Sequence, residues 1–180
     1  MRQKTKAYDI TMTAVCVGLI AVCSWISIPT AVPFTLQTFG VFITMGLLGG
    51  KRGTAAVLVY IILGATGVPV FSGFGGGIGA LAGPTGGYIV GFLFMALAMW
   101  GLERLIGRST GALLASMVIG LLVCYAFGTV WFMAVYARTA GAIGLGTVLG
   151  MCVIPFLIPD AAKIALAMLF VRRIGKYVKA

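Results

Sequence analysis

Two oppositely charged residues, Asp160 and Lys163, interrupt the last apolar stretch of the sequence in the segment FLIPDAAKIAL. Their three-residue spacing places both side chains on one face of a helix, close enough to pair. A charged residue inside a membrane-spanning helix costs about 2.5 to 3.5 kcal/mol on insertion scales, so such a residue marks a functional site by default. An acceptor and a donor held together suit a polar ligand, whereas the alternative is a buried ion pair that serves only assembly.

The surrounding composition indicates that this pair lies in a membrane. Hydrophobic residues make up 61% of the 180 positions and charged residues 9%, whereas soluble domains are roughly half apolar and a quarter charged. The apolar runs approach the roughly 20 residues that a spanning helix needs, and transmembrane β-strands would instead be short and alternating. We therefore expect an all-α integral membrane protein in which residues 1–180 form a single membrane domain.

Breaks between the apolar runs predict a bundle of six transmembrane helices. The second and third segments are short, so they need a thin region of the bilayer or do not both span it fully. The first segment is longer than the apolar part of a signal peptide, and we interpret it as a helix. Because proline fits the first turn of a helix, Pro159 predicts a break in the last run, with a short outer segment near 147–157 and a final helix over about 159–175. The six predicted segments are 10–28, 36–49, 53–66, 85–103, 111–134 and 144–171.

The basic residues predict the orientation of these segments. Of the 13 lysines and arginines, all except Arg138 and Lys163 fall in the terminal segments or in the loops after the second and fourth helices. Cytoplasmic loops are enriched in lysine and arginine, so both termini are expected in the cytoplasm. The net charge of +10 is then an orientation signal in a lipid bilayer, and it does not indicate a nucleic-acid partner. A helix that rises from Arg172 to Asp160 covers about 18 Å, which places Asp160 in the outer half of the membrane, where a helix N-terminus favours a carboxylate.

A glycine-dense segment, FSGFGGGIGALAGPTGGY at residues 71–88, lies in the outer connection between the third and fourth predicted helices. It lacks the Lys-Ser/Thr pair of a phosphate-binding loop. Glycine permits close backbone approach, so this loop is expected to fold over a cavity and to offer backbone groups, as at Gly76, to a ligand. Thr85 adds a hydroxyl, and Phe74 and Tyr88 add aromatic rings. The alternative is a tightly packed connector without a ligand.

The sequence makes several function classes improbable. It contains no histidine, and its four cysteines lack C-x-x-C spacing, so neither a metal site nor a Cys/His nucleophile is expected. No paired carboxylates or ATP-binding motif indicates an enzyme, and no charged residue between Arg52 and Glu103 supplies the polar lining of a channel. A binding subunit for transport and an autonomous proton-coupled carrier, with Asp160 as its proton site, are the classes that remain.

Small residues at one-turn spacing indicate close helix contacts. Ala14-x-x-x-Gly18 lies in the first predicted helix, and Gly46-x-x-x-Gly50 lies at the end of the second. Such pairs let neighbouring backbones approach. For Ala14 and Gly18 we leave two alternatives open, packing inside the bundle and docking to another membrane protein.

Taken together, the segments GVPVFSGFGGGIGALAGPTGGY, PFTLQTFGVFI and IPDAAK resemble the BioY family, the biotin-binding S components of energy-coupling factor (ECF) vitamin transporters. The resemblance covers nearly the whole chain. It implies a six-helix subunit of the bacterial cytoplasmic membrane that captures biotin without enzymatic activity or a cofactor. Its implied partners are a transmembrane coupling protein and two cytoplasmic ATPases.

The resemblance also implies roles for individual residues. Asp160 and Lys163 match the family residues that hold the ureido ring of biotin, which agrees with the donors and acceptor of that group. Ala14-x-x-x-Gly18 stands where the family has an Ala-x-x-x-Ala docking pattern. Because the glycine-rich loop contains no arginine for the valerate carboxylate, Tyr136 and Arg138 are the candidates for that contact.

Overall fold

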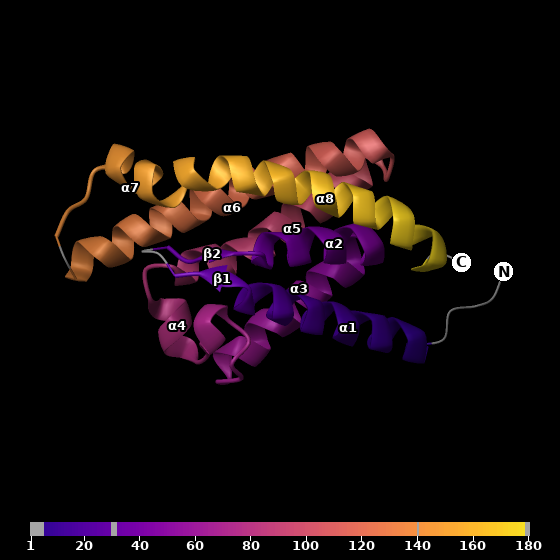
Figure 1. Ribbon diagram of the computed structural model, residues 1–180, viewed down its shortest axis with the longest axis horizontal. Helices are drawn as coiled ribbons and strands as arrows, with labels where there is room; N and C mark the ends of the chain where they lie inside the picture. Colours follow the sequence, from indigo (N-terminus) through magenta and orange to yellow (C-terminus); the bar gives the residue numbers. More distant parts are fainter. Residues whose placement is uncertain (1–5, 30–31, 140, 179–180) are drawn as a thin grey trace.

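The structure, a computed structural model, describes residues 6–29, 32–139 and 141–178. Helices running along its long axis form an elongated bundle (Figure 1), which confirms the all-helical class. The longer helices are α1 (Lys6–Trp25), α2 (Gln37–Leu48), α3 (Gly50–Ala65), α5 (Gly86–Ile106), α6 (Thr110–Thr139) and α8 (Ile154–Val178). Each overlaps one of the six predicted segments.

Among the described residues, four stretches are long and apolar enough to cross a membrane: Lys6–Trp25, Gly86–Ile106, Thr110–Arg138 and Leu145–Lys176. The last stretch combines α7 (Leu145–Cys152) with α8. α2 is apolar but has only 12 residues, which is about 18 Å at the helical rise and shorter than the roughly 30 Å hydrocarbon core. The chain is therefore a multi-pass membrane protein with two short helices, α2 and α3, inside the bundle.

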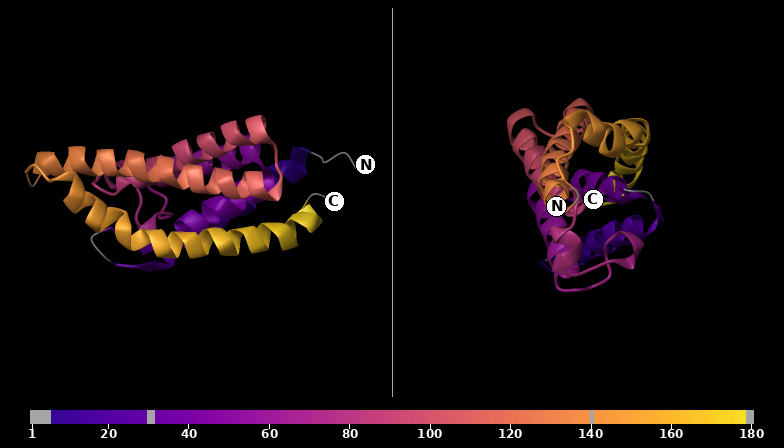
Figure 2. Two further views of the ribbon diagram at one scale, coloured as in Figure 1. Left: turned by 90° about the horizontal axis from the view of Figure 1, so that it is seen from above. Right: turned by 90° about the vertical axis from the view of Figure 1, so that its left-hand side faces the viewer.

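The predicted break before Pro159 is wrong. The chain leaves helical geometry at Val153, which has φ −125° and ψ −57°, and α8 begins at Ile154. Pro155 lies in the first turn of α8, where its missing N–H has no partner to lose. Pro159 lies inside the helix, at the cost of one backbone hydrogen bond, and α8 follows a curved course along the bundle (Figure 2).

Glycine lets the chain turn sharply between α2 and α3. Gly49 has φ +79°, and its N–H donates to the Met45 carbonyl at 3.0 Å, which ends α2. A side chain there would be strained by the positive φ and would also contact the Arg108 guanidinium. Gly50, predicted at the end of the second helix, is instead the first residue of α3.

Close packing of α5 on α6 also requires glycine. A Cβ at Gly128 would overlap the Tyr88 ring, and one at Gly87 would overlap the Trp131 side chain. The Trp131 indole N–H in turn donates to the Gly83 carbonyl at 3.1 Å. These contacts fix the start of α5 against α6, and so position Thr85 and Tyr88.

Short elements cover one end of the bundle (Figure 1). Between α1 and α2, β1 (Ser27–Ile28) pairs antiparallel with β2 (Phe34–Thr35). Between α3 and α5 lie the 3₁₀ helix η1 (Ser72–Phe74) and α4 (Ile78–Ala82). The start of α1 and the end of α8 lie at the opposite end, together with the ion pairs Asp9–Arg52 and Glu103–Arg108.

Candidate ligand-binding site

Asp160 lies in the first part of α8 and faces α2 and α6. Its side chain is 2% exposed. One carboxylate oxygen accepts hydrogen bonds from the Thr38 hydroxyl at 3.0 Å and from Lys163 Nζ at 2.8 Å, and the other accepts one from the Tyr125 hydroxyl. Three helices therefore hold this carboxylate in one position.

Lys163 is the cationic partner that the sequence predicted, and the ion pair confirms that the two side chains share a helix face. The residue is 6% exposed. Its Nζ also lies 5.2 Å from the centroid of the Phe34 ring, in β2. A desolvated cation over an aromatic face gains about 2 kcal/mol, so the hairpin after α1 contributes to holding this ammonium group.

The ion pair lies in a cavity of about 90 Å³ at the end of the bundle that carries the β-hairpin. Ile89, Phe92 and Phe156 contribute apolar walls. The polar residues that line the cavity come from six elements and from the connection before α5: Thr35, Gln37, Thr38, Ser72, Thr85, Tyr88, Tyr125, Asp160 and Lys163. The structure thus brings together four of the predicted site residues, Asp160, Lys163, Thr85 and Tyr88.

Gln37, Thr38 and Tyr125 line the same cavity but were not predicted. Gln37 Nε2 donates to the Tyr60 hydroxyl at 2.6 Å, and that hydroxyl donates to the Val70 carbonyl at 2.8 Å. The Ser24 hydroxyl donates to the same carbonyl. A continuous chain of buried hydrogen bonds therefore connects the cavity with α1, α3 and the segment that precedes the glycine-rich loop.

The glycine-rich segment contributes to the cavity near its two ends, through Ser72, Thr85 and Tyr88. Its interior is folded on itself: the Phe71 N–H donates to the Gly75 carbonyl at 2.9 Å, and the Gly77 N–H donates to the Gly64 carbonyl at 2.7 Å. Gly64 lies directly against the Phe71 ring. Within the segment, Gly76, Gly86 and Gly87 leave no room for a Cβ, and Gly73 and Gly77 have positive φ, so these five glycines serve its tight fold.

Two predicted residues of this segment do not line the cavity in the described structure. Phe74 has φ +58°, is 65% exposed and stacks on Trp25 with ring centroids 5.2 Å apart. The positive φ turns its ring outward. Gly76 lies against the backbone of Val68 and Gly67, so its tight turn directs it away from the cavity.

Tyr136 and Arg138 also lie outside the cavity. Tyr136 stacks on Phe132 with ring centroids 5.6 Å apart, in a small apolar cluster that adjoins the cavity through Tyr88 and Cys152. Arg138 is exposed near the end of α6. α6 extends beyond the hairpin end of the bundle (Figure 2), which separates Arg138 from Asp160.

The two small-residue pairs have different surroundings. Gly46 lies against Val171 of α8 and Gly50 against Trp100 of α5, so this pair serves packing inside the bundle. Ala14 and Gly18 are exposed on α1, and a Cβ at Gly18 would meet no atom within 4 Å. The outward position of Ala14 and Gly18 leaves them accessible to another membrane protein.

The described residues contain no group of three or more acidic, cysteine or histidine side chains that would hold a metal ion. All four cysteines are free and buried. Cys124 and Cys152 line the cavity as small, weakly polar walls. The chemistry of the site is therefore that of hydrogen bonds and one ion pair.

A buried, hydrogen-bonded ion pair in a cavity lined by polar and apolar side chains, near one end of a membrane helix bundle, defines a membrane protein that binds a small polar ligand. The comparisons with known proteins identify the family. The family model described as the BioY family matches residues 1–180, and the chain belongs to this family.

Two curated relatives match over almost their whole length. The biotin transporter BioY of Thermotoga maritima is 43% identical over 178 residues, which cover 98% of this chain and 97% of that protein. The probable biotin transporter BioY of Pyrococcus horikoshii is 39% identical over 170 residues, covering 94% and 97%. A crystal structure of the S component for biotin from an ECF-type ABC transporter matches with a TM-score of 0.84 and 28% identity, covering 98% of this chain and 95% of that one.

Proposed function

We propose that this chain captures biotin and serves as the substrate-specific subunit of an ECF-type transporter. The observation that carries the proposal is the buried Asp160–Lys163 pair in a cavity that further polar side chains also line. Relatives that match nearly end to end are described as biotin transporters, and a solved structure of the same fold is described as a biotin S component.

The chemistry of the pair fits the ureido ring of biotin. A ureido group presents two N–H donors and one carbonyl acceptor, which a carboxylate and an ammonium group complement. A carboxylate offers about four lone-pair sites, and Asp160 uses three of them for Thr38, Tyr125 and Lys163. Ureido binding therefore adds to this network or replaces one of its contacts. Thr85 and Tyr88 also line the cavity.

Binding requires the cavity to widen. Its volume of about 90 Å³ is below the roughly 300 Å³ at which pockets for small molecules begin. Residues of the β-hairpin and of the glycine-rich segment line it, and both segments connect helices of the bundle. We assign the widening to these elements, because the helices beneath them are fixed by the close α5–α6 packing.

We further propose that α1, α2, α3, α5, α6 and α8 are the six membrane segments, with both termini in the cytoplasm of a bacterial cell. The short α2 and α3 fit a locally thin bilayer, and the basic residues at the end with the termini support the orientation. Energy then comes from a coupling protein and two ATPases, and exposed Ala14 and Gly18 are the docking surface. The chain itself binds without catalysis and without a cofactor.

Uptake of labelled biotin tests this function. A strain without its own biotin uptake expresses the chain alone or with a coupling protein and two ATPases. Energy-dependent uptake that requires the ATPases, together with their co-purification, supports the proposal. Uptake by the chain alone that is abolished by an uncoupler would instead indicate an autonomous proton-coupled carrier.

A further inference from the structure

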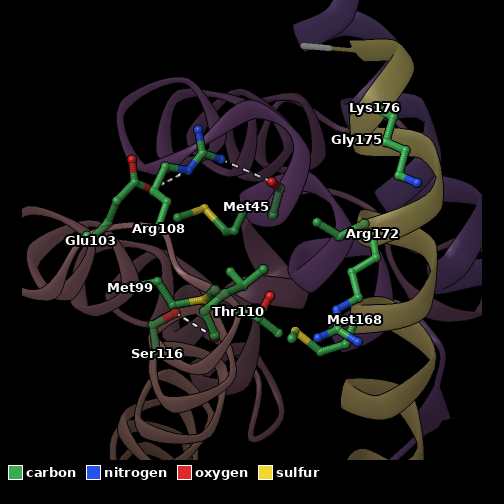
Figure 3. Close-up of a pocket in the computed structure, with 14 residues that line it drawn as sticks. Met45, Met99, Glu103, Arg108, Thr110, Ser116, Met168, Arg172, Gly175 and Lys176 are labelled. Carbon is green, nitrogen blue, oxygen red and sulfur yellow. Dashed lines mark hydrogen bonds and ion pairs between the residues drawn. The ribbon is translucent and has the colours of Figure 1, made fainter.

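A second cavity lies at the end of the bundle opposite the ion pair, between α2, α5, α6 and α8. It has a volume of about 270 Å³. Figure 3 shows Arg172 and Lys176 of α8 on one side and Glu103 and Arg108 on the other. Apolar side chains, among them Met45, complete the wall.

The charges of this cavity do not balance. Its lining contains three cations, Arg108, Arg172 and Lys176, and one anion, Glu103, which leaves two positive charges. Glu103 accepts the Gly50 N–H at 2.7 Å and lies 3.7 Å from Arg108. Arg108 also donates to the Gly46 carbonyl at 3.0 Å. The uncompensated cations are therefore those of α8.

The chain has no acidic side chain left to neutralise them. It contains only three aspartates and glutamates in all. Asp9 pairs with Arg52, Asp160 pairs with Lys163, and Glu103 is engaged as described. Arg172 and Lys176 are exposed, so an anion from outside can reach them, and no acidic side chain of this protein competes for them.

We propose that this cavity binds a phosphate group, carried either by an anionic membrane lipid or by a free phosphate ion. Guanidinium and ammonium groups are the side chains that bind phosphate most strongly. Thr110, the first residue of α6, adds a hydroxyl at a helix N-terminus, which also favours an anion. Basic pockets between membrane helices on the cytoplasmic side bind anionic headgroups in general. The assignment of this cavity to the cytoplasmic side rests on the orientation proposed above, whereas the cavity and its charges do not depend on it.

The cavity is large enough for more than an ion. Its volume of about 270 Å³ is several times the roughly 30 Å³ that one water molecule occupies in the liquid. Met99, Met168 and Val171 give it apolar walls next to the cations. A phosphate with an attached glycerol and the start of an acyl chain matches this lining, and a free phosphate matches only its polar part.

Lipid binding to the full-length purified chain tests the proposal. Native mass spectrometry measures the affinity for phosphatidylglycerol and for phosphatidylcholine with the same acyl chains, and inorganic phosphate is titrated in a separate arm. We expect a preference for phosphatidylglycerol. The double variant Arg172→Gln/Lys176→Gln is expected to weaken that binding about tenfold, from two lost charge-assisted contacts.

The matched control is Arg104→Gln/Arg173→Gln, which removes the same charge at the same end but from residues outside the cavity. Its affinity is expected to change less than about twofold, because general surface attraction remains. If inorganic phosphate displaces the lipid in the parent and not in Arg172→Gln/Lys176→Gln, the site is real and free phosphate is a ligand. If phosphate has no effect while the lipid preference requires Arg172 and Lys176, the ligand is the headgroup.

The proposal would be overturned if the two double variants lost the same amount of phosphatidylglycerol affinity. It would also be overturned if the parent neither preferred phosphatidylglycerol over phosphatidylcholine nor bound inorganic phosphate. Biotin binding is measured on the same samples and is expected to stay at the parent level, since the two cavities lie at opposite ends of the bundle. A parent that fails to bind biotin but retains the lipid preference would refute the proposed function alone. Melting curves confirm that each variant is folded.

Discussion

Replacing Asp160 with asparagine preserves the shape of the side chain but removes the charged acceptor. In the structure this carboxylate accepts hydrogen bonds from Thr38, Tyr125 and Lys163, so the change affects both the ligand and the protein. A hydrogen bond to a charged group contributes about 1.5 to 3 kcal/mol. At about 1.4 kcal/mol per tenfold, biotin affinity should fall between about tenfold and about 150-fold.

Stability should fall as well, because Lys163 is left buried without its anion. Breaking a buried pair from one side costs about 3 to 5 kcal/mol in the free energy of unfolding. Asp160→Asn/Lys163→Met removes both charges and should recover part of that loss without recovering biotin affinity. Asp9→Asn is the matched control: its ion pair with Arg52 is exposed, so both affinity and stability should remain close to those of the parent.

Equilibrium binding and thermal unfolding are measured on each purified variant with and without biotin. A ligand that binds only the folded state raises the melting temperature with its occupancy, so biotin should protect the parent strongly and Asp160→Asn weakly. If Asp160→Asn and Lys163→Met both keep the parent affinity and only their melting temperatures fall, the pair is structural and the site assignment is refuted.

Three other predictions concern packing, docking and orientation. Gly128→Ala should destabilise the protein by about 1 to 3 kcal/mol, because the new Cβ would overlap the facing aromatic ring of α5. The control Gly101→Ala places its Cβ in open space and should leave the stability unchanged. Equal melting temperatures for the two variants would contradict the close α5–α6 packing. Leucine at both Ala14 and Gly18 should weaken co-purification of a coupling protein while biotin binding persists. Unchanged co-purification with lost biotin binding would refute the docking role of these residues. A cysteine at Ser72 should react with an impermeant reagent from outside the cell, and labelling only from the cytoplasm would reverse the proposed orientation.

Charge made part of the site predictable from the sequence. A carboxylate and an ammonium group are so costly in an apolar segment that Asp160 and Lys163 could be singled out by type and spacing alone. Gln37 and Thr38 carry a weaker signal, because uncharged polar residues also occur in helix packing. Tyr125 carries none, since its position in a long apolar run does not distinguish a cavity wall from a lipid-facing ring.

Backbone geometry limited the remaining predictions. The apolar runs predicted the helices because their lengths follow from membrane thickness. The break was misplaced because the segment contains two prolines, Pro155 and Pro159, and residue type alone does not tell which of them lies in the first turn of α8. The glycine-rich segment predicted a tight fold over the cavity without indicating which side chains point inward. The positive φ of Phe74 turned that ring toward Trp25, and this angle becomes visible only in the folded chain.

The most direct test of biotin capture is equilibrium binding of biotin to the purified chain in lipid nanodiscs, without any partner protein. We predict saturable binding of a single biotin per chain, because every residue assigned to the ligand belongs to this chain. A folded chain that binds no biotin, or that binds it only when a coupling protein and its ATPases are added, would contradict the account.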